Sequence, residues 1–215
     1  MNVTDLIDYA RQNYNAVGDT FFSDGELYVH LFNAQMELAT KSQCIRRVYT
    51  TTTTAGTQEY AKPTLSIGIK RVTYNGAKLT PITMRQDDEL TLGNMASTAQ
   101  GTPTCYYEWG DSIFLRDIPD SSSATLKIFS YDKPSTVSAS STLDVPDRYH
   151  ADLAEYLLWR MTLKDKDPGM AGAFKESWDR KVKDAIVYER RILRTDSFTG
   201  VRDSEFFTEA LVGPL

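Results

Sequence analysis

The chain has 215 residues, of which 41% are hydrophobic and 25% are charged, and its formal net charge is -5. That length is enough for one well-buried core, or for a core and a second small module. The negative net charge argues against a free duplex-DNA-binding protein, because neutralisation of phosphates by Lys and Arg supplies most of the affinity of such proteins.

The cysteines and the N-terminus exclude further classes. Only two cysteines, Cys44 and Cys105, and two histidines, His30 and His150, are present, and their spacing matches no zinc motif. The first twelve residues lack the basic and apolar parts of a signal peptide, and no apolar run approaches the roughly 20 residues of a membrane span. We therefore expect a soluble protein made in a reducing compartment, with no membrane partner and no disulfide.

Two helices are predicted near the N-terminus. Apolar residues at helical spacing predict the first over residues 3–14, capped by Asn2 or Thr4. The second is predicted to begin at a capping box formed by Ser23 and Glu26 and to run to about residue 42. Phe22 stands where a hydrophobic staple would hold the entry of this helix.

After residue 43 the hydrophobic period falls from about 3.6 to about 2, which is typical of strands. Strands are predicted over residues 45–54, 57–61, 67–74, 78–83, 104–109, 112–116 and 124–131, with a helical turn over 85–92. Asn75-Gly76 is the strongest hairpin signal. Ala55-Gly56 indicates another turn, after which residues 57–61 are expected to return as a second strand beside residues 45–54. Ile67 and Ile69 are expected to point inward.

Helices return near the C-terminus. One is predicted from residue 147 to 166, and a longer one from 170 to 194, separated by Asp167-Pro168-Gly169. The last stretch has no clean period, although solvated tails are usually poor in aromatic residues. It carries apolar side chains at Phe198, Phe206, Phe207, Leu211 and Leu215.

This order predicts an α+β fold: a helical bundle formed by the N- and C-terminal helices, an inserted antiparallel β-rich domain and an extended C-terminal tail. The expected units are residues 1–43 and 144–194, which form the bundle, residues 44–143, which form the insert, and residues 195–215, which form an extended arm.

No constellation that carries catalysis is found. There is no nucleophile elbow and no Gly-rich phosphate loop. The run Asp87-Asp88-Glu89 is typical of a solvated face, because adjacent side chains point apart. The basic residues of 170–194 alternate with acids, which favours an exposed face laced with ion pairs. We therefore predict no catalytic, cofactor-binding or metal-binding residues and no cofactor.

Several local phrases, taken in order, resemble the head-to-tail adaptor (connector or head-completion) proteins of tailed bacteriophages. The phrases lie at residues 21–27, 55–63, 69–76, 79–82, 101–103, 106–107, 115–119 and 145–150, and the resemblance covers roughly residues 4–190. Residues past 195 align with nothing in that family.

The resemblance implies a structural virion protein made in the host cytoplasm, without enzymatic activity. Such proteins form rings, typically of twelve copies, between the portal protein and a tail tube, nozzle or terminator protein. They extend the channel through which genomic DNA passes without specific binding. The resemblance also implies that the C-terminal segment binds the portal, which would use Phe198, Phe206, Phe207, Leu211 and Leu215.

Two other functions stay open. Tyr106, Tyr107 and Trp109 would stack on sugars if the chain were a monomeric carbohydrate-binding module, although aromatic residues in alternating strands are more often core. An unrecognised enzyme would instead bring carboxylates together in a pocket.

Overall fold

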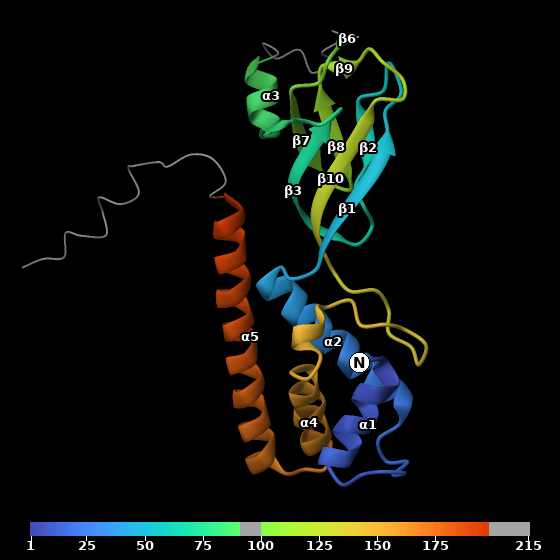
Figure 1. Ribbon diagram of the computed structural model, residues 1–215, viewed down its shortest axis with the longest axis vertical. Coiled ribbons are helices and arrows are strands. Elements are labelled where there is room, and N and C mark those ends of the chain that lie inside the picture. The colour runs from blue at the N-terminus through green and yellow to red at the C-terminus, as the bar shows by residue number, and fades with distance from the viewer. Residues whose placement is uncertain (91–99, 198–215) are drawn as a thin grey trace, which may run out of the picture.

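The computed structural model describes residues 1–90 and 100–197, and it is elongated, with helices at one end and sheets at the other (Figure 1). The predicted α+β class is confirmed, because long helices and antiparallel sheets occupy separate segments of the chain. Across the described residues, each helix is too short or too polar to cross a lipid bilayer.

Helix α1 (Val3–Asn13) begins as its local sequence predicts. The Asn2 side chain accepts a hydrogen bond from the backbone N–H of Asp5 at 2.7 Å, and the Asp5 carboxylate accepts one from the Asn2 N–H at 3.2 Å. This reciprocal pair is a complete capping box, which satisfies N–H groups that a helix start otherwise leaves without a partner.

Helix α2 (Asp24–Ser42) begins after Ser23, whose hydroxyl accepts a hydrogen bond from the Glu26 N–H at 3.4 Å. The other half of the predicted capping box is wrong. The Glu26 carboxylate accepts a hydrogen bond from Lys164 instead, because an ammonium group within reach is the stronger donor. The predicted staple position Phe22 is buried in the helical core.

The C-terminal helices are the short 3-10 helix η1 (Asp147–Tyr149), α4 (Leu153–Lys164) and α5 (Pro168–Ser197). The prediction of one continuous helix from 147 is therefore wrong at its start. The Asp167 carboxylate caps α5 by accepting from two backbone N–H groups, and Pro168 suits the first position because its missing donor is not needed there.

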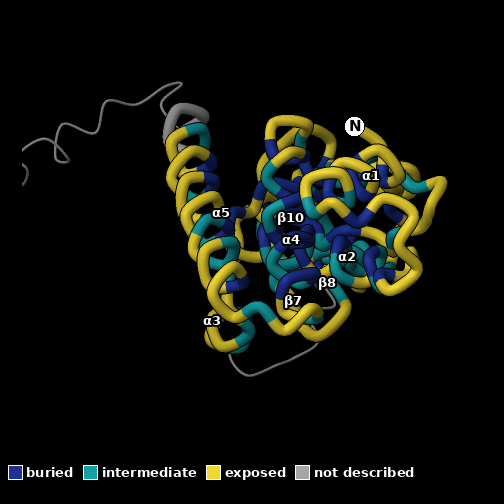
Figure 2. The backbone as a smooth tube through the Cα atoms, turned by 90° about the horizontal axis from the view of Figure 1, so that it is seen from below, coloured by how far each residue is buried: buried dark blue, intermediate teal, exposed yellow. Residues whose placement is uncertain are grey.

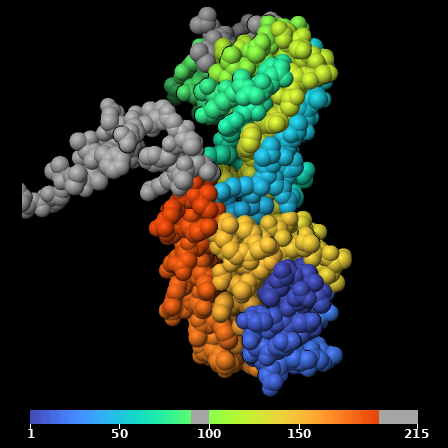
Figure 3. Space-filling view, in the orientation of Figure 1, coloured from blue at the N-terminus to red at the C-terminus, as the bar shows by residue number. Residues whose placement is uncertain are grey.

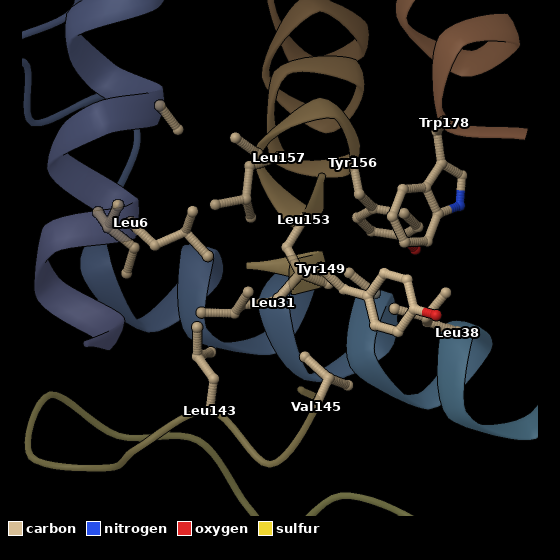
Figure 4. Close-up of a cluster of buried hydrophobic side chains, with 14 of the residues drawn as sticks. Leu6, Leu31, Leu38, Leu143, Val145, Tyr149, Leu153, Tyr156, Leu157 and Trp178 are labelled. Carbon is tan, nitrogen blue, oxygen red and sulfur yellow. The ribbon is translucent and has the colours of Figure 1, made fainter. Parts of the chain in front are cut away.

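The long helices share one hydrophobic core (Figure 4). Leu6 of α1, Leu31 of α2, Leu157 of α4 and Trp178 of α5 point toward one another and are almost fully buried. Viewed from below, α5 turns a buried face to the other helices and an exposed face to solvent (Figure 2).

Two four-stranded sheets form the other end of the molecule. The first, sheet A, has the order β1 (Arg46–Thr52), β10 (Thr125–Asp132), β3 (Ser66–Tyr74) and β4 (Ala77–Lys78), and all its pairs are antiparallel. The second, sheet B, has the order β2 (Glu59–Ala61), β8 (Ser112–Arg116), β7 (Cys105–Trp109) and β5 (Thr80–Pro81), with β5 parallel to β7.

The two sheets enclose a second hydrophobic core. Val72 and Leu126 of sheet A meet Ile113 and Leu115 of sheet B there, all four fully buried. A short parallel pair, β6 (Gln100–Gly101) with β9 (Ile118–Pro119), and helix α3 (Met84–Leu90) lie at the far end of the sheets (Figure 1).

Three expectations about the strands are wrong. Residues 59–61 do not pair back onto β1 but join sheet B. The strand expected over residues 78–83 is divided, so that β4 completes sheet A and β5 enters sheet B. Ile67 points outward and is 43% exposed, because a bulge between β10 and β3 shifts the alternation along β3.

Candidate functional site

The residues predicted to bind a partner, Phe198, Phe206, Phe207, Leu211 and Leu215, lie outside the described residues. Their role remains a prediction. Among the described residues, two clusters of ion pairs lie where the helical end meets the sheets.

A buried carboxylate holds this junction together. Glu189 of α5 is 0% exposed, and its carboxylate accepts hydrogen bonds from Arg46 of β1 at 2.6 Å and from the Tyr149 hydroxyl at 2.7 Å. It also pairs with Arg148. Because these partners come from β1 and η1, one side chain of α5 joins that helix to two other segments. Figure 3 shows the C-terminal end of α5 against the place where the helical end meets the sheets.

The electrostatics of the junction favour a structural role. Burial, together with the hydrogen bond to Glu189, raises the pKa of Tyr149 to about 12, against the opposing effect of Arg148. The phenol therefore stays protonated and donates permanently at neutral pH. A buried carboxylate that accepts from donors on several segments stabilises a fixed geometry.

A second ion cluster fixes the return from the sheets to the helices. Arg47 pairs with Asp144, and its Nε lies 3.8 Å from Asp132 at the end of β10. Asp144 also accepts hydrogen bonds from the backbone N–H and the hydroxyl of Ser135, at 2.7 and 2.5 Å. The chain passes between the helical end and the sheets twice, before β1 and after β10. An arginine–carboxylate pair stabilises each of these connections.

Sheet A is strongly basic although the chain is acidic. Its four strands contain six basic residues, Arg46, Arg47, Lys70, Arg71, Lys78 and Lys127, and one acidic residue, Asp132, which is a difference of five charges. Asp132 is buried and accepts hydrogen bonds from Ser130 and Tyr49.

A groove of about 360 Å³ lies between sheet A and the C-terminal end of α5. Arg46, Lys70, Arg71 and Lys78 contribute its charge, and Val48, Phe129 and Leu193 contribute apolar surface. We call this hollow the basic groove. Lys70, Arg71 and Lys78 form no ion pair with any described residue, and the Arg71 guanidinium lies 4.9 Å from the centre of the Phe129 ring.

The aromatic residues considered for sugar stacking do not form one platform. Tyr106 is 3% exposed and belongs to the core between the sheets. Tyr107 stacks on Phe114 with ring centroids 5.1 Å apart, and Trp109 is 63% exposed. Because side chains alternate along β7, Tyr106 lies on the opposite face of the strand from Tyr107 and Trp109.

The remaining candidate groups are separate from one another. The His150 ring contacts the Val145 carbonyl at 2.9 Å, and His30 lies 3.7 Å from Glu26. Cys44 and Cys105 are both free thiols. Asp87 pairs with Arg116 of β8, and in the described ranges no three His, Cys, Asp or Glu side chains are placed to hold a metal ion.

Sequence reasoning missed both Glu189 and the basic groove, although signals for them exist. Glu189 falls on the buried stripe of α5 with Trp178, Val182 and Ala185, where an acid needs a partner. The basic groove could have been found by counting charge separately for each predicted strand.

The family model described as SU10 adaptor protein matches residues 1–202, and the chain belongs to this family. It is therefore a phage adaptor-type structural protein, expected in the virion in contact with other phage structural proteins. No curated protein matches the chain.

Proposed function

We propose that this chain is a head-to-tail adaptor that forms a ring, of twelve copies, between the portal and the tail of a phage. The observation that carries the proposal is the family match over residues 1–202. The elongated shape, with a separate core at each end, supports it, because an adaptor needs distinct surfaces for different partners.

In this proposal the chain has four functional units. Residues 1–43 and 144–194 form the helical bundle that gives each ring subunit its body, and residues 44–143 form an inserted β-rich domain. Residues 195–215 form the arm that binds the portal through its phenylalanines and leucines. The ion pair between Glu189 of α5 and Arg46 of β1 supports this arrangement, because it joins the helical bundle to the β-rich domain at their boundary.

An apolar tip at the free end of the helices supports contact with a neighbour or partner. The loop after α1 exposes Val17 and Phe21, which are 72% and 49% exposed. The last turn of α4 exposes Leu163 and the first turn of α5 exposes Met170, which are 45% and 50% exposed. Lys164 donates a hydrogen bond to the Phe21 carbonyl at 2.5 Å, so the loop after α1 lies against the end of α4. Clustered exposed apolar side chains mark interaction surfaces more often than single ones do.

The charge of the chain suits a channel for DNA. In the proposed ring, genomic DNA passes without specific binding, since a net charge of -5 per subunit opposes tight binding of phosphates. The tail-side partner is a tail tube, nozzle or terminator protein.

The arm is tested by binding to the portal protein of the same phage. We expect the chain to co-sediment with portal rings and the Phe206→Ser/Phe207→Ser variant to lose most of this binding. A Tyr9→Ser variant, which removes an exposed aromatic side chain of α1, is the matched control and should bind as the wild type does. Equal binding by all three proteins would contradict the role of the arm.

A carbohydrate-binding module is the second candidate, favoured only by the exposure of Trp109 beside Tyr107. It predicts a monomer that binds glycans and loses binding in the Trp109→Ala variant. Glycan binding by the wild type, without binding to the portal, would favour this function over the adaptor.

A further inference from the structure

The basic groove is unusual because its cations surround an apolar floor. Val48 is 55% exposed there, beside the half-buried Phe129 ring. Arg46 already pairs with Glu189, whereas Lys70, Arg71 and Lys78 form no ion pair with a described residue. A ligand that fits must bring negative charges and apolar groups together.

This chemistry favours an acidic, aromatic peptide over a nucleic acid. A phosphate backbone gains affinity from closely spaced free cations and gains little from exposed aliphatic surface. A peptide that carries carboxylates and phenyl rings satisfies both parts of the basic groove.

Residues 198–215 of this same chain have that composition. They contain Phe198, Phe206 and Phe207 together with Asp203, Glu205 and Glu209, and only one basic residue, Arg202.

This segment also starts beside the basic groove. Leu193 of α5 lines the groove, and α5 ends four residues later, at Ser197. The last residue of α5, Ser197, therefore lies roughly 6 Å beyond Leu193 along the helix axis. Eighteen residues can extend on the order of 60 Å, so the segment can fold back into the groove without strain.

We propose that the basic groove is a docking site for residues 198–215 of the same chain. The carboxylates of Glu205 and Glu209 pair with Lys70, Arg71 or Lys78, and a phenylalanine of the segment packs on Val48 and Phe129. A groove of about 360 Å³ holds only one or two side chains, so docking engages part of the segment. Any partner that takes the segment must first displace it.

Amide hydrogen exchange of the full-length chain, read by mass spectrometry over residues 199–212, tests the proposal. We expect the wild-type segment to exchange more slowly than an unprotected peptide. The Lys70→Glu/Lys78→Glu variant, which reverses two exposed charges, should exchange about tenfold faster than the wild type. Adding Glu205→Lys/Glu209→Lys to that variant should restore the protection, which a misfolded protein would not do.

Lys166→Glu/Lys183→Glu is the matched control, because it changes net charge equally on exposed residues of the helical end. It should leave the exchange of the segment as in the wild type. Protection that does not depend on Lys70 and Lys78 would overturn the proposal, as would a wild-type segment that exchanges at the unprotected rate.

Two further outcomes would assign the basic groove to another occupant and overturn the proposal. Protection that disappears on dilution would mean that the segment comes from a neighbouring copy. Binding of a duplex oligonucleotide at 0.15 M salt that requires Lys70 and Lys78, with no protection of the segment, would mean a nucleic-acid site. The exchange is measured on the protein alone, so its failure is distinct from a failure of portal binding.

Discussion

At the scale of single residues, the junction depends on Glu189, whose carboxylate has three partners and no exposed surface. The Glu189→Gln substitution keeps the shape of the side chain but removes its charge, which leaves Arg46 and Arg148 without a counter-ion. Breaking one side of a buried ion pair costs about 3 kcal/mol where the other partners keep some contact with water. We expect the free energy of unfolding, measured in urea, to fall by that amount.

The matched control is Glu176→Gln on the exposed face of the same helix. Glu176 accepts a 3.5 Å hydrogen bond from Arg180, and both side chains are more than two-thirds exposed. Exposed pairs of this kind contribute at most about 0.5 kcal/mol. If the two variants lost equal stability, the junction would not depend on the burial of Glu189.

His30 makes stability depend on pH in the mildly acidic range. Burial, followed by the positive charge of Arg160, lowers the pKa of His30 from its ordinary value. The unfolded chain therefore binds the proton more tightly than the folded protein does. The contribution of neutral His30 is complete above about pH 6.5, and it is lost as the pH falls through the lower pKa of the folded state.

Urea unfolding of the wild type and of His30→Gln between pH 7.5 and pH 5 measures this effect. The wild type should lose stability over that interval, and the variant should lose less. Hydrogen bonding by Lys164 lowers the pKa of Glu26, the carboxylate beside His30, so Glu26 stays charged throughout. An identical loss in both proteins would show that His30 takes no part.

At the scale of elements, the turn between β3 and β4 requires a glycine at one position. Asn75 has φ 45° and Gly76 has φ 83°, the geometry of the predicted hairpin turn. Gly76→Ala should destabilise the protein by about 1 kcal/mol, because a Cβ disfavours positive φ.

Gly25→Ala in the first turn of α2 is the matched control. Nothing lies within 4 Å of a Cβ built at either glycine, but Gly25 has no positive φ. The alanine there should therefore raise stability by about 0.5 kcal/mol. Thermal unfolding of both variants measures the contrast, and the same sign of change in both would refute the argument from φ.

Local signals explain which elements could be predicted from the sequence. Asn2, Ser23, the Asn75-Gly76 pair and Asp167 act within three residues, so their consequences were visible without knowledge of the fold. The sheet that β2 and β5 each join could not be predicted, because each pairs with a strand about 25 or more residues away in the sequence. Pairing over such distances is decided by the packing of the two sheets together.

The contrast between local signals and pairings of distant segments applies to the candidate site as well. The alternation of acids and bases in α5 correctly indicated surface ion pairs, such as the 3.5 Å contact between Arg180 and Glu176. It also concealed Glu189, whose partners come from β1 and η1. The basic groove depends on β1, β3, β4 and α5 together, which no single stretch of sequence contains.

At the scale of the whole molecule, charge is unevenly distributed. Sheet A carries five excess positive charges in a chain of net charge -5, so the remainder carries ten excess negative charges. Opposite charges on different surfaces favour contacts between unlike faces of neighbouring copies, and such contacts form a ring when the rotation between copies closes. We therefore expect assembly to weaken as salt is raised from 0.05 to 0.5 M, which analytical ultracentrifugation measures.

The central claim is that the chain assembles as a ring on the portal. The most direct test is light scattering of the chain mixed with the portal protein of the same phage. The account predicts an added mass of about 290 kDa per portal ring, which is twelve chains of 24.2 kDa each. A chain that remains at 24.2 kDa beside unaltered portal rings would contradict the account.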